Sequence, residues 1–495
     1  MRIVRTHEQS PNSVPDQQEL DWIYNGLDCC VTHDVFAALS DQLDPYTAAT
    51  YAFSRALQAP TMEMRTRGVL VDQARKAEVI DEYFASIEKL EANLERIVLD
   101  GVGMPYFNWR SSADLKRLFY DELGIPPIRK QGRPTTDRGA REKLEAYPIA
   151  QQIAKHINAI SDLAKKISVL KTEIDADGRI RTSYNIAGTS TGRFSSSFSE
   201  FGTGGNLQNV EESLRSIFIS DPGFKFAKFD AKSGESFVVG AIEWNLFHDD
   251  LYLSACETGD PHTAVARICW PNLGWTGEPS RDKSIAESPY YRHYTYRFMC
   301  KKLGHGSNYG GRPDTLATQS KLPIGVVRDF QPKYFSAFPS HQRWQHDVET
   351  QLRTSGYLIS LLGRKRWFFG RRSDSSTLRE AIAYDPQSSL ADIVNRAMLR
   401  IWRKRIAITV MHDHDALTFM YPETHEDTII PLLHAELLEH IQLKHNRTLS
   451  IPYDCKVGWN KGDWGAHNPD GLKDYLGHDE RKRSPKVGIL DRVIR

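Results

Sequence analysis

The segment AITVMHDHDALTFMY (residues 407–421) constrains the fold more than any other part of the chain. Apolar and β-branched residues flank four consecutive polar ones, which are His412, Asp413, His414 and Asp415. This pattern predicts two short strands joined by a polar turn. Histidines two positions apart share one face of a strand and suit zinc, whereas carboxylates suit magnesium. A turn without metal is the third interpretation.

A second aspartate stands at the end of another strand-like run, since Asp230 closes the apolar segment KFAKFD (residues 225–230). Two carboxylates at the ends of neighbouring strands could hold a pair of magnesium ions, whose remaining ligands are water and phosphate oxygens. No third zinc ligand follows near His412 and His414 in the sequence. Each aspartate taken alone also fits an ordinary turn, so the residues themselves leave the three interpretations open.

The segment YRFMCKKLGHGSNYGG (residues 296–311) predicts a functional helix face. Arg297, Lys301, His305 and Tyr309 recur every four residues, so they share one side of a helix with modest angular drift. Two cations suit a triphosphate, and a tyrosine can stack on a base. The alternative is a solvated basic face that ends in a tyrosine.

Composition sets broader limits. The 495 residues allow about three domains, and a formal net charge of +1 means that any basic surface must be local. The six cysteines form no CxxC pair and the N-terminus has no apolar segment, which favours a reducing, cytoplasmic setting. No run approaches 18 apolar residues, so we expect no membrane span.

Together these segments resemble family A DNA polymerases, the DNA polymerase I type, in a phage or viral branch. TSTGRFSS and NLQN (residues 189–196 and 206–209) are similar to one family segment. FDAKSGES (residues 229–236) resembles the first catalytic motif and MHDHD the second. The face from Arg297 to Tyr309 resembles the fingers helix. Weaker similarities follow in the family's order over roughly residues 20–465.

The resemblance implies an α+β chain with the right-hand polymerase fold, in which an antiparallel palm sheet carries helical fingers and a helical thumb. The implied reaction is template-directed addition of dNTPs to the 3′-hydroxyl of a primer, with release of pyrophosphate, in DNA replication. Primer-template DNA would be the partner, and the setting would be the cytoplasm of a bacterial host. The expected domains are a lead-in with an exonuclease remnant (1–59), the thumb (60–180, with a palm entry at 60–72), a first palm segment (181–259), the fingers (260–345), a second palm segment (346–465) and a tail (466–495).

The resemblance also implies roles for individual residues. Two Mg²⁺ ions would be held by Asp230, Asp413 and the backbone carbonyl of Ala231, and Lys301 would be the acid for the leaving pyrophosphate. Glu235 would crowd the sugar 2′ position and so exclude ribonucleotides. The expected dNTP contacts are Arg297, Lys301, His305, His262, Glu235 and Tyr309. The expected DNA contacts are Arg193, Gln387, Arg379, His412 and Tyr309.

Gly234 stands where the family has Gln, and three further positions depart from the family pattern. His305 stands where Phe or Tyr is usual, His414 replaces a Glu and Ala383 replaces an Asn. These changes support a rival interpretation, a catalytically inert DNA-binding relic of a polymerase, although the retention of both catalytic aspartates opposes it. A single-subunit phage RNA polymerase is the other rival, but such enzymes have Gly in place of Glu235 and lack the TGRFSS segment.

The segment YNGLD (residues 24–28) resembles the motif that closes the 3′→5′ exonuclease domain of the family. Such a nuclease also needs a D-x-E pair from earlier strands, and the 23 residues before Tyr24 contain none. We therefore expect no proofreading activity in this chain. A separate exonuclease subunit that acts in trans is an expected partner.

Overall fold

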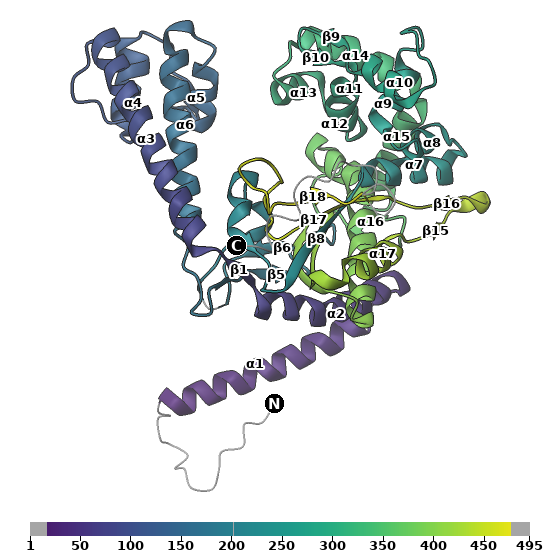
Figure 1. The fold of residues 1–495 in the computed structure, drawn as a ribbon. Helices are drawn as coiled ribbons and strands as arrows, with labels where there is room; N and C mark the ends of the chain where they lie inside the picture. Colours follow the sequence, from purple (N-terminus) through teal and green to yellow (C-terminus); the bar gives the residue numbers. More distant parts are fainter. Residues whose placement is uncertain (1–16, 201, 477–495) are drawn as a thin grey trace.

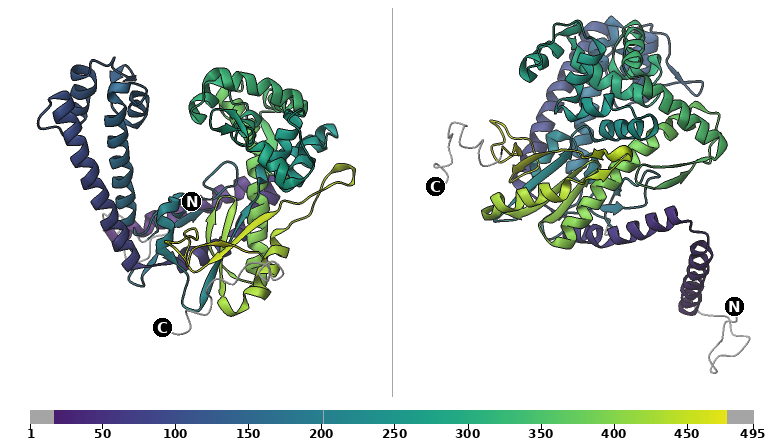
Figure 2. Two further views of the ribbon diagram at one scale, coloured as in Figure 1. Left: turned by 45° about the horizontal axis from the view of Figure 1, so that its top comes forward. Right: turned by 90° about the vertical axis from the view of Figure 1, so that its right-hand side faces the viewer.

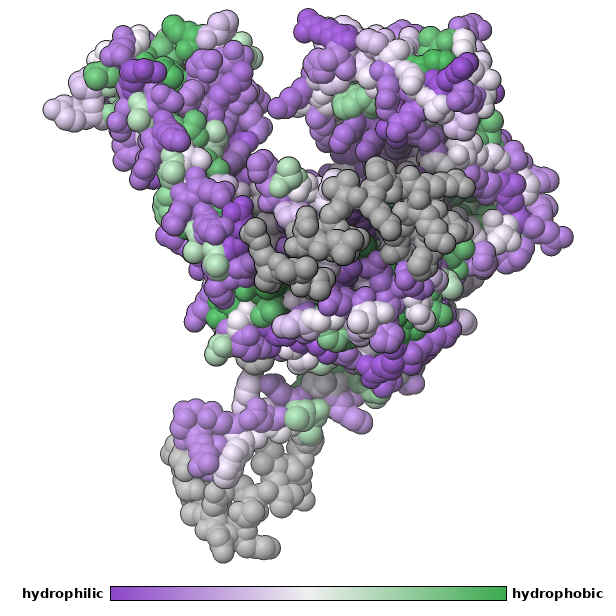
Figure 3. Space-filling model, viewed as in Figure 1, coloured by the Kyte–Doolittle hydropathy of each residue, from purple (hydrophilic) through white to green (hydrophobic). Residues whose placement is uncertain are grey.

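The computed structural model describes residues 17–200 and 202–476. Two helical projections rise from a base that contains an antiparallel sheet (Figure 1). A view turned about the horizontal axis keeps the two projections apart (Figure 2), and the faces that they turn toward one another are mostly hydrophilic (Figure 3). This combination of sheet and helices confirms the expected α+β class.

The base is built on a five-stranded sheet in the order β13-β14-β8-β17-β18, in which all neighbouring pairs are antiparallel. Its strands are β8 (Phe224–Ala231), β13 (Ile408–Asp413), β14 (Ala416–Pro422), β17 (Tyr453–Gly458) and β18 (Lys473–Asp474). Strands β13 and β14 form the hairpin that the sequence predicts. Strand β18 lies in the segment expected to be a tail, so the sheet extends beyond residue 465.

Long helices cover the sheet and bury its apolar residues. Helix α16 packs against the helices α7, α17 and α2, and its inner side chains join those of β8 and β14, such as Phe229 and Phe419, in one core. An apolar stripe on a helix is stable only when another element covers it. The four helices are α2 (Pro45–Arg67), α7 (Gly234–Phe247), α16 (Ser375–Lys404) and α17 (Glu426–Leu437).

One projection is the helical arm (residues 73–170), in which α3 and α6 pack side by side. Asp72 caps α3 by accepting from the Arg75 N–H at 2.9 Å, and Gly103 ends it with a φ of 74°, a conformation that glycine adopts without strain. The arm has a core of its own. Its elements are α3 (Gln73–Val102), α4 (Ser112–Lys116), η1 (Arg117–Glu122), β2 (Arg129–Lys130), β3 (Arg133–Pro134), α5 (Arg138–Leu144) and α6 (Pro148–Leu170).

The other projection is the helical lobe (residues 251–354), which belongs to the main core of the protein. Its helices are α8 (Leu251–Glu257), α9 (Pro261–Cys269), α10 (Pro279–Ala286), α11 (Tyr296–Met299), η4 (Cys300–Gly304), α12 (His305–Asn308), α13 (Pro313–Ser320), α14 (Ile324–Ala337) and α15 (Pro339–Thr354). A hairpin of β9 (Pro289–Tyr291) and β10 (Tyr294–Thr295) precedes α11. Segments α11, η4 and α12 form one continuous helical run, and η4 is π-helical.

A buried polar network ties the lobe to α7. The ring of His341 on α15 bonds to the Glu243 carboxylate on α7, and both side chains are almost fully buried. Tyr334 donates its hydroxyl to Asn308 Oδ1 at 2.8 Å and lies 3.1 Å from the second ring nitrogen of His341. Because buried polar groups need partners, this network fixes how α12 and α15 sit on the base.

Shorter elements fill the rest of the described chain. A three-stranded sheet in the order β4-β1-β7 lies where the arm leaves the base. Its strands are β1 (Val69–Val71), β4 (Arg179–Ile180) and β7 (Phe218–Ile219). The remaining strands are β5 (Ser183–Asn185), β6 (Ser195–Ser197), β11 (Tyr357–Ile359), β12 (Lys365–Trp367), β15 (Ile441–Gln442) and β16 (Thr448–Leu449), and the short helical turns are η2 (Leu207–Asn209), η3 (Glu212–Ile217), η5 (Glu423–His425) and η6 (Lys444–Asn446).

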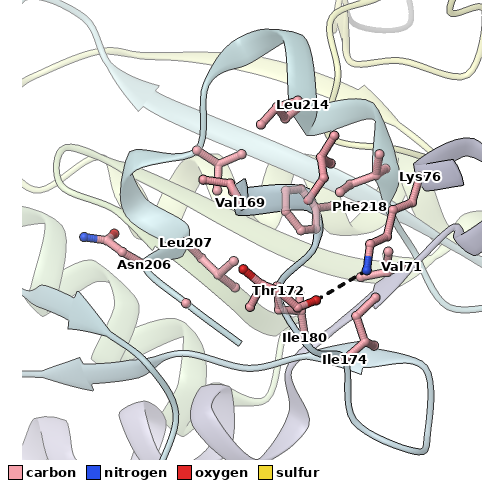
Figure 4. A pocket seen from close by; sticks show the side chains of 14 residues that line it. Val71, Lys76, Val169, Thr172, Ile174, Ile180, Asn206, Leu207, Leu214 and Phe218 are labelled. Carbon is pink, nitrogen blue, oxygen red and sulfur yellow. Dashed lines mark hydrogen bonds between the residues drawn. The ribbon is translucent and has the colours of Figure 1, made fainter. Parts of the chain in front are cut away.

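A small apolar pocket of about 40 Å³ lies at the junction between the arm and this three-stranded sheet (Figure 4). Val71, Ile180 and Phe218 of the sheet line it, together with residues at the end of α6. Lys76 reaches its edge and donates to the Thr172 carbonyl at 3.3 Å, and burial lowers the pKa of this lysine. The packing between the arm and the base therefore leaves a small cavity at their junction.

Helix α1 (Gln17–Ser40) projects from the base at the N-terminal end (Figure 1). It lies in the segment expected to be a lead-in with an exonuclease remnant (1–59), and it contains the YNGLD residues 24–28. Positions 1–16 of the lead-in and 477–495 of the tail lie outside the described residues. Across the described ranges, no helix combines the length and apolar character that crossing a membrane requires.

Candidate active site

Three aspartates lie in one row across the five-stranded sheet, and we call them the carboxylate row. The register pairs Asp413 with Ala416, Ala416 with Asp230 and Asp230 with Asp454. Directly opposed residues in antiparallel strands point to the same face. Asp413 and Asp230 are thus separated by one strand, or about 9–10 Å of backbone, and by only the methyl group of Ala416.

Asp230 is the middle aspartate of the row. Its side chain is 53% exposed and lies 3.5 Å from Lys228 Nζ. Partial burial raises the pKa of Asp230, Lys228 opposes this rise, and the negative charge of Asp415 adds to it. The next residue, Ala231, donates its N–H to the Asp415 carbonyl at 3.0 Å, which fastens the hairpin turn to β8.

Asp413 is the more enclosed of the two expected metal ligands. Its Oδ2 accepts from Lys461 Nζ at 2.6 Å, while Oδ1 is buried and has no hydrogen-bond partner among the described residues. His414, the first residue of the turn, has a φ of 63°, which two-residue hairpin turns demand although non-glycine residues rarely adopt it.

The carboxylate row fits a hard divalent cation. Asp230 and the unpaired Oδ1 of Asp413 are the oxygen donors that Mg²⁺ prefers. In the part of the chain that the structure describes, no group of three or more His, Cys, Asp or Glu side chains is placed to hold a metal. Water and phosphate oxygens would therefore complete the shell, as is usual for Mg²⁺.

His412 is not placed to act as a metal ligand at this row. Its ring is fully buried, stacks on Phe194 with 4.4 Å between the ring centroids and bonds through Nε2 to Asn395 Oδ1 at 2.8 Å. Asn395 also donates to the Gly192 carbonyl at 3.3 Å. The GRF portion of the TSTGRFSS segment is thus clamped between α16 and β13.

A pocket of about 520 Å³ adjoins the end of β8 and gathers several of the expected phosphate contacts. Arg297 and Lys301 line it from α11 and η4, and His262 lines it from α9. Arg297 bonds to Asp260 at 3.1 Å. Burial and the charge of Arg297 lower the pKa of His262 to about 4, so this ring is neutral at pH 7 and can act as a hydrogen-bond donor but not as a cation.

Glu235 joins three segments that are distant in the sequence. Its carboxylate accepts from the Arg193 guanidinium and from the Tyr309 hydroxyl, and His305 Nε2 lies 3.7 Å away. Burial raises the pKa of Tyr309 far above its ordinary value, and Glu235 adds to this rise. The hydroxyl therefore keeps its proton at neutral pH and donates a hydrogen bond to Glu235.

The other expected DNA contacts lie on α16. Arg379 is exposed and Gln387 is half-buried, and Ala383 is on the same helix. Their roles in DNA contact stay predictions.

Sequence reasoning missed the polar partners of the expected residues. Lys461 lies in the VGWNKGDWG segment and Asp454 in an alternating strand pattern, but neither has a local signal for its place beside the row. The sequence could have identified Asp260 as a polar partner in this site, because it stands two residues before His262. The pairing of Asn395 with His412 depends on a contact between α16 and β13.

Comparison with known proteins shows the family. The model of "DNA polymerase family A" matches residues 75–269 and 283–466. The chain is 27% identical over 430 residues to "DNA polymerase I, thermostable" of Thermus aquaticus, covering 83% of this chain and 47% of that protein. It is 26% identical over 468 residues to DNA polymerase I of Treponema pallidum, covering 89% and 43%. The chain thus spans about half the length of the curated relatives that it matches.

A solved structure shares the fold. The POL domain of Pol1 from M. smegmatis, in complex with DNA primer-template and dNTP, superimposes with a TM-score of 0.64. The match covers 82% of this chain and 69% of that one, at 22% sequence identity. The right-hand architecture expected from the sequence is therefore confirmed.

Proposed function

The chain belongs to DNA polymerase family A, and on this premise we propose that it is a template-directed DNA polymerase that adds dNTPs to a primer 3′-hydroxyl during DNA replication. One observation carries the proposal. The carboxylate row on β13 and β8 adjoins, through Lys232 and Ser233, the pocket that holds Arg297 and Lys301. Metal-binding carboxylates beside a cationic pocket are what the transfer of a nucleotidyl group from a nucleoside triphosphate, with pyrophosphate as the leaving group, requires.

The metal would bind at the carboxylate row. Asp230, Asp413 and the carbonyl of Ala231 would hold it, and the free Oδ1 of Asp413 supports this assignment. When bound, two Mg²⁺ ions would lower the pKa of the primer hydroxyl and neutralise the triphosphate. The hairpin turn keeps the two aspartates at a fixed separation, because the Ala231 N–H bonds to Asp415.

The cationic pocket would bind the triphosphate. Arg297 offers a planar pair of donors and is oriented by Asp260. His262, neutral at pH 7, would donate one hydrogen bond. Lys301 would bind the phosphates and deliver a proton to the leaving pyrophosphate.

Glu235 would act as the barrier to ribonucleotides. The bonds from Arg193 and Tyr309 fix its side chain, so that it could not turn away from a 2′-hydroxyl. His305 lies one helical turn beyond Lys301 and would face the incoming sugar. The proposed DNA contacts are Arg193, Gln387, Arg379, His412 and Tyr309. Because His412 is fully buried, it would act on the DNA indirectly, through the residues packed around it.

The segments of the chain would then take the roles of a right hand. The thumb (60–180) includes the helical arm, the fingers (260–345) form most of the helical lobe, and the palm (181–259 and 346–465) contains every strand of the five-stranded sheet except β18. Primer-template DNA would lie in the opening between arm and lobe, whose facing surfaces are mostly hydrophilic (Figure 3). The reaction would take place in the cytoplasm of a bacterial host cell, and an exonuclease subunit in trans is a further proposed partner.

Primer extension with Mg²⁺ tests the proposal against its rivals. A labelled primer-template is incubated with dNTPs, with rNTPs or without nucleotides. Extension that strongly favours dNTPs is the expected result. Efficient extension with rNTPs would identify an RNA polymerase, and binding of the primer-template without extension would identify an inert relic.

A further inference from the structure

Every aspartate of the carboxylate row has a lysine beside it. The Nζ···Oδ distances are 2.6 Å for Lys461 and Asp413, 3.5 Å for Lys228 and Asp230, and 3.8 Å for Lys232 and Asp454. Exposure separates the three lysines, because the side chains are 3%, 20% and 39% exposed, respectively. Lys228 and Lys232 can withdraw into solvent when a cation binds, whereas Lys461 cannot.

A rigid loop holds Lys461 in place. Its backbone N–H donates to the Phe218 carbonyl at 2.9 Å, and the next N–H, of Gly462, donates to Asn460 Oδ1 at 2.9 Å. Asn468 bonds to the same Asn460 oxygen at 3.0 Å. The ammonium group also lies 2.7 Å from Met411 Sδ, in the same strand as Asp413. The loop, the strand and the carboxylate therefore enclose the ammonium on several sides.

We infer that Lys461 is a positioning residue for nucleotidyl transfer, which holds Asp413 Oδ2 so that only Oδ1 is offered to the divalent cation. The inference rests on the proposed polymerase function. It follows from three observations: Oδ2 is already bonded, Oδ1 is buried without a partner among the described residues, and the lysine is enclosed. A charge that is buried beside its counter-ion stays there, because leaving either one unpaired is costly.

The fixed ammonium group has two opposite effects on the metal. It orients Asp413, which lets the cation sit at one place between β13 and β8. It also repels the cation, because like charges within a few ångströms interact strongly in a partly buried site. The local charge is already less negative than the family pattern implies, since His414 stands where a Glu is usual. Lys461 would thus weaken metal binding in the free protein and restrict the bound cation to one position.

The test compares Lys461→Met with the wild type and with Lys456→Met. Lys456 is the matched control, because it lies in the preceding strand β17 and pairs with Asp463 at 3.1 Å rather than with an aspartate of the row. Binding of Mn²⁺ to the protein without DNA or nucleotide is measured by electron paramagnetic resonance. The rate of single-nucleotide addition at saturating Mg²⁺ and the affinity for primer-template are measured in parallel.

We expect Lys461→Met to bind Mn²⁺ at least about tenfold more tightly and to add nucleotides at least about tenfold more slowly. Primer-template affinity should stay the same, and Lys456→Met should match the wild type in all three measurements. If the Met variant does not fold, Lys461→Gln is measured instead, with the same expected direction. Mn²⁺ affinity that is unchanged or weaker in a folded variant overturns the inference. Absence of extension by the wild type would instead reject the polymerase function, and the Mn²⁺ result would still stand by itself.

Discussion

Replacement of Asp385 by Asn should stabilise the protein at neutral pH but not at low pH. Asp385 lies in α16, and its Oδ1 accepts from the Leu361 N–H at 2.7 Å and from the Ser389 hydroxyl at 2.7 Å. Burial raises the pKa of this carboxyl from 3.8 to about 6, although both hydrogen bonds oppose the rise. An Asn side chain has the same shape and can accept both bonds with its amide oxygen.

The magnitude follows from the two pKa values. Because folding raises the pKa, the contribution of Asp385 to stability is fully present below pH 4 and is lost as the pH rises through 6. Each unit of difference between the folded and unfolded pKa is equivalent to about 1.4 kcal/mol. The ionised carboxylate therefore costs up to about 3 kcal/mol at pH 7.5, an upper bound since the residue keeps some contact with solvent.

Thermal unfolding of the two proteins between pH 4 and 8 checks this expectation. The Asn variant should unfold at the same temperature as the wild type near pH 4 and up to about 3 °C higher at pH 7.5, because a chain of this length shifts by roughly 1 °C per kcal/mol. Asp81→Asn, on the exposed side of α3, is measured in parallel as the control for the Asp-to-Asn change. A constant difference between Asp385→Asn and the wild type at all pH values would refute the reasoning.

Three further replacements test the lobe and the nucleotide site. Glu235→Ala should raise the ratio of ribonucleotide to deoxyribonucleotide incorporation by about 10- to 200-fold, and an unchanged ratio in competition assays would mean that Glu235 is not the barrier. His305→Phe should alter discrimination against 3′-deoxy nucleotides more than it alters DNA affinity, whereas equal effects on all substrates would indicate a packing role. His341→Leu should lower the free energy of unfolding by about 3–5 kcal/mol, because Glu243 is left buried without its partner. The double variant His341→Leu/Glu243→Leu should recover much of that loss. If denaturant unfolding shows that the two substitutions lower the free energy of unfolding additively, the pairing of His341 with Glu243 is contradicted.

Local patterns predicted the elements that carry the chemistry. The alternation around residues 412–415 identified β13, β14 and the turn between them, because a two-residue turn between apolar runs has few other solutions. Asp230 was placed at a strand end because it closes the apolar run KFAKFD, and the structure puts it in β8. The sequence could not show that β8 pairs with β14, since strand order depends on contacts between residues 186 to 198 positions apart.

The fingers helix shows a different limit of prediction from the sequence. A spacing of four residues exceeds the 3.6 residues of an α-helical turn, so Arg297, Lys301 and His305 should drift around the helix by about 40° at each step. The structure contains the wider π-helical segment η4 between Cys300 and Gly304, which reduces this drift where Lys301 lies. Such segments are rare and often occur at functional sites, and propensities along the chain do not predict them.

The partners of the expected residues were the least predictable feature. Lys461 is buried against Asp413 because the loop after β17 folds back onto β13, and a lysine in VGWNKGDWG is otherwise ordinary. The bonds that fix Glu235 join residues 193, 235 and 309, which only the tertiary fold brings together. Residue roles that depend on such pairs need the structure.

The role of the carboxylate row is tested most directly by single-turnover nucleotide addition with Asp413→Asn, measured beside the wild type in Mg²⁺. The substitution keeps the size of the side chain but removes the charge that would hold the cation. We expect the rate to fall by at least about a thousandfold, because several kcal/mol of charge stabilisation are lost and each 1.4 kcal/mol is worth tenfold in rate. The primer-template dissociation constant should remain near that of the wild type. Nucleotide addition at a near-normal rate by Asp413→Asn would contradict the assignment of this site.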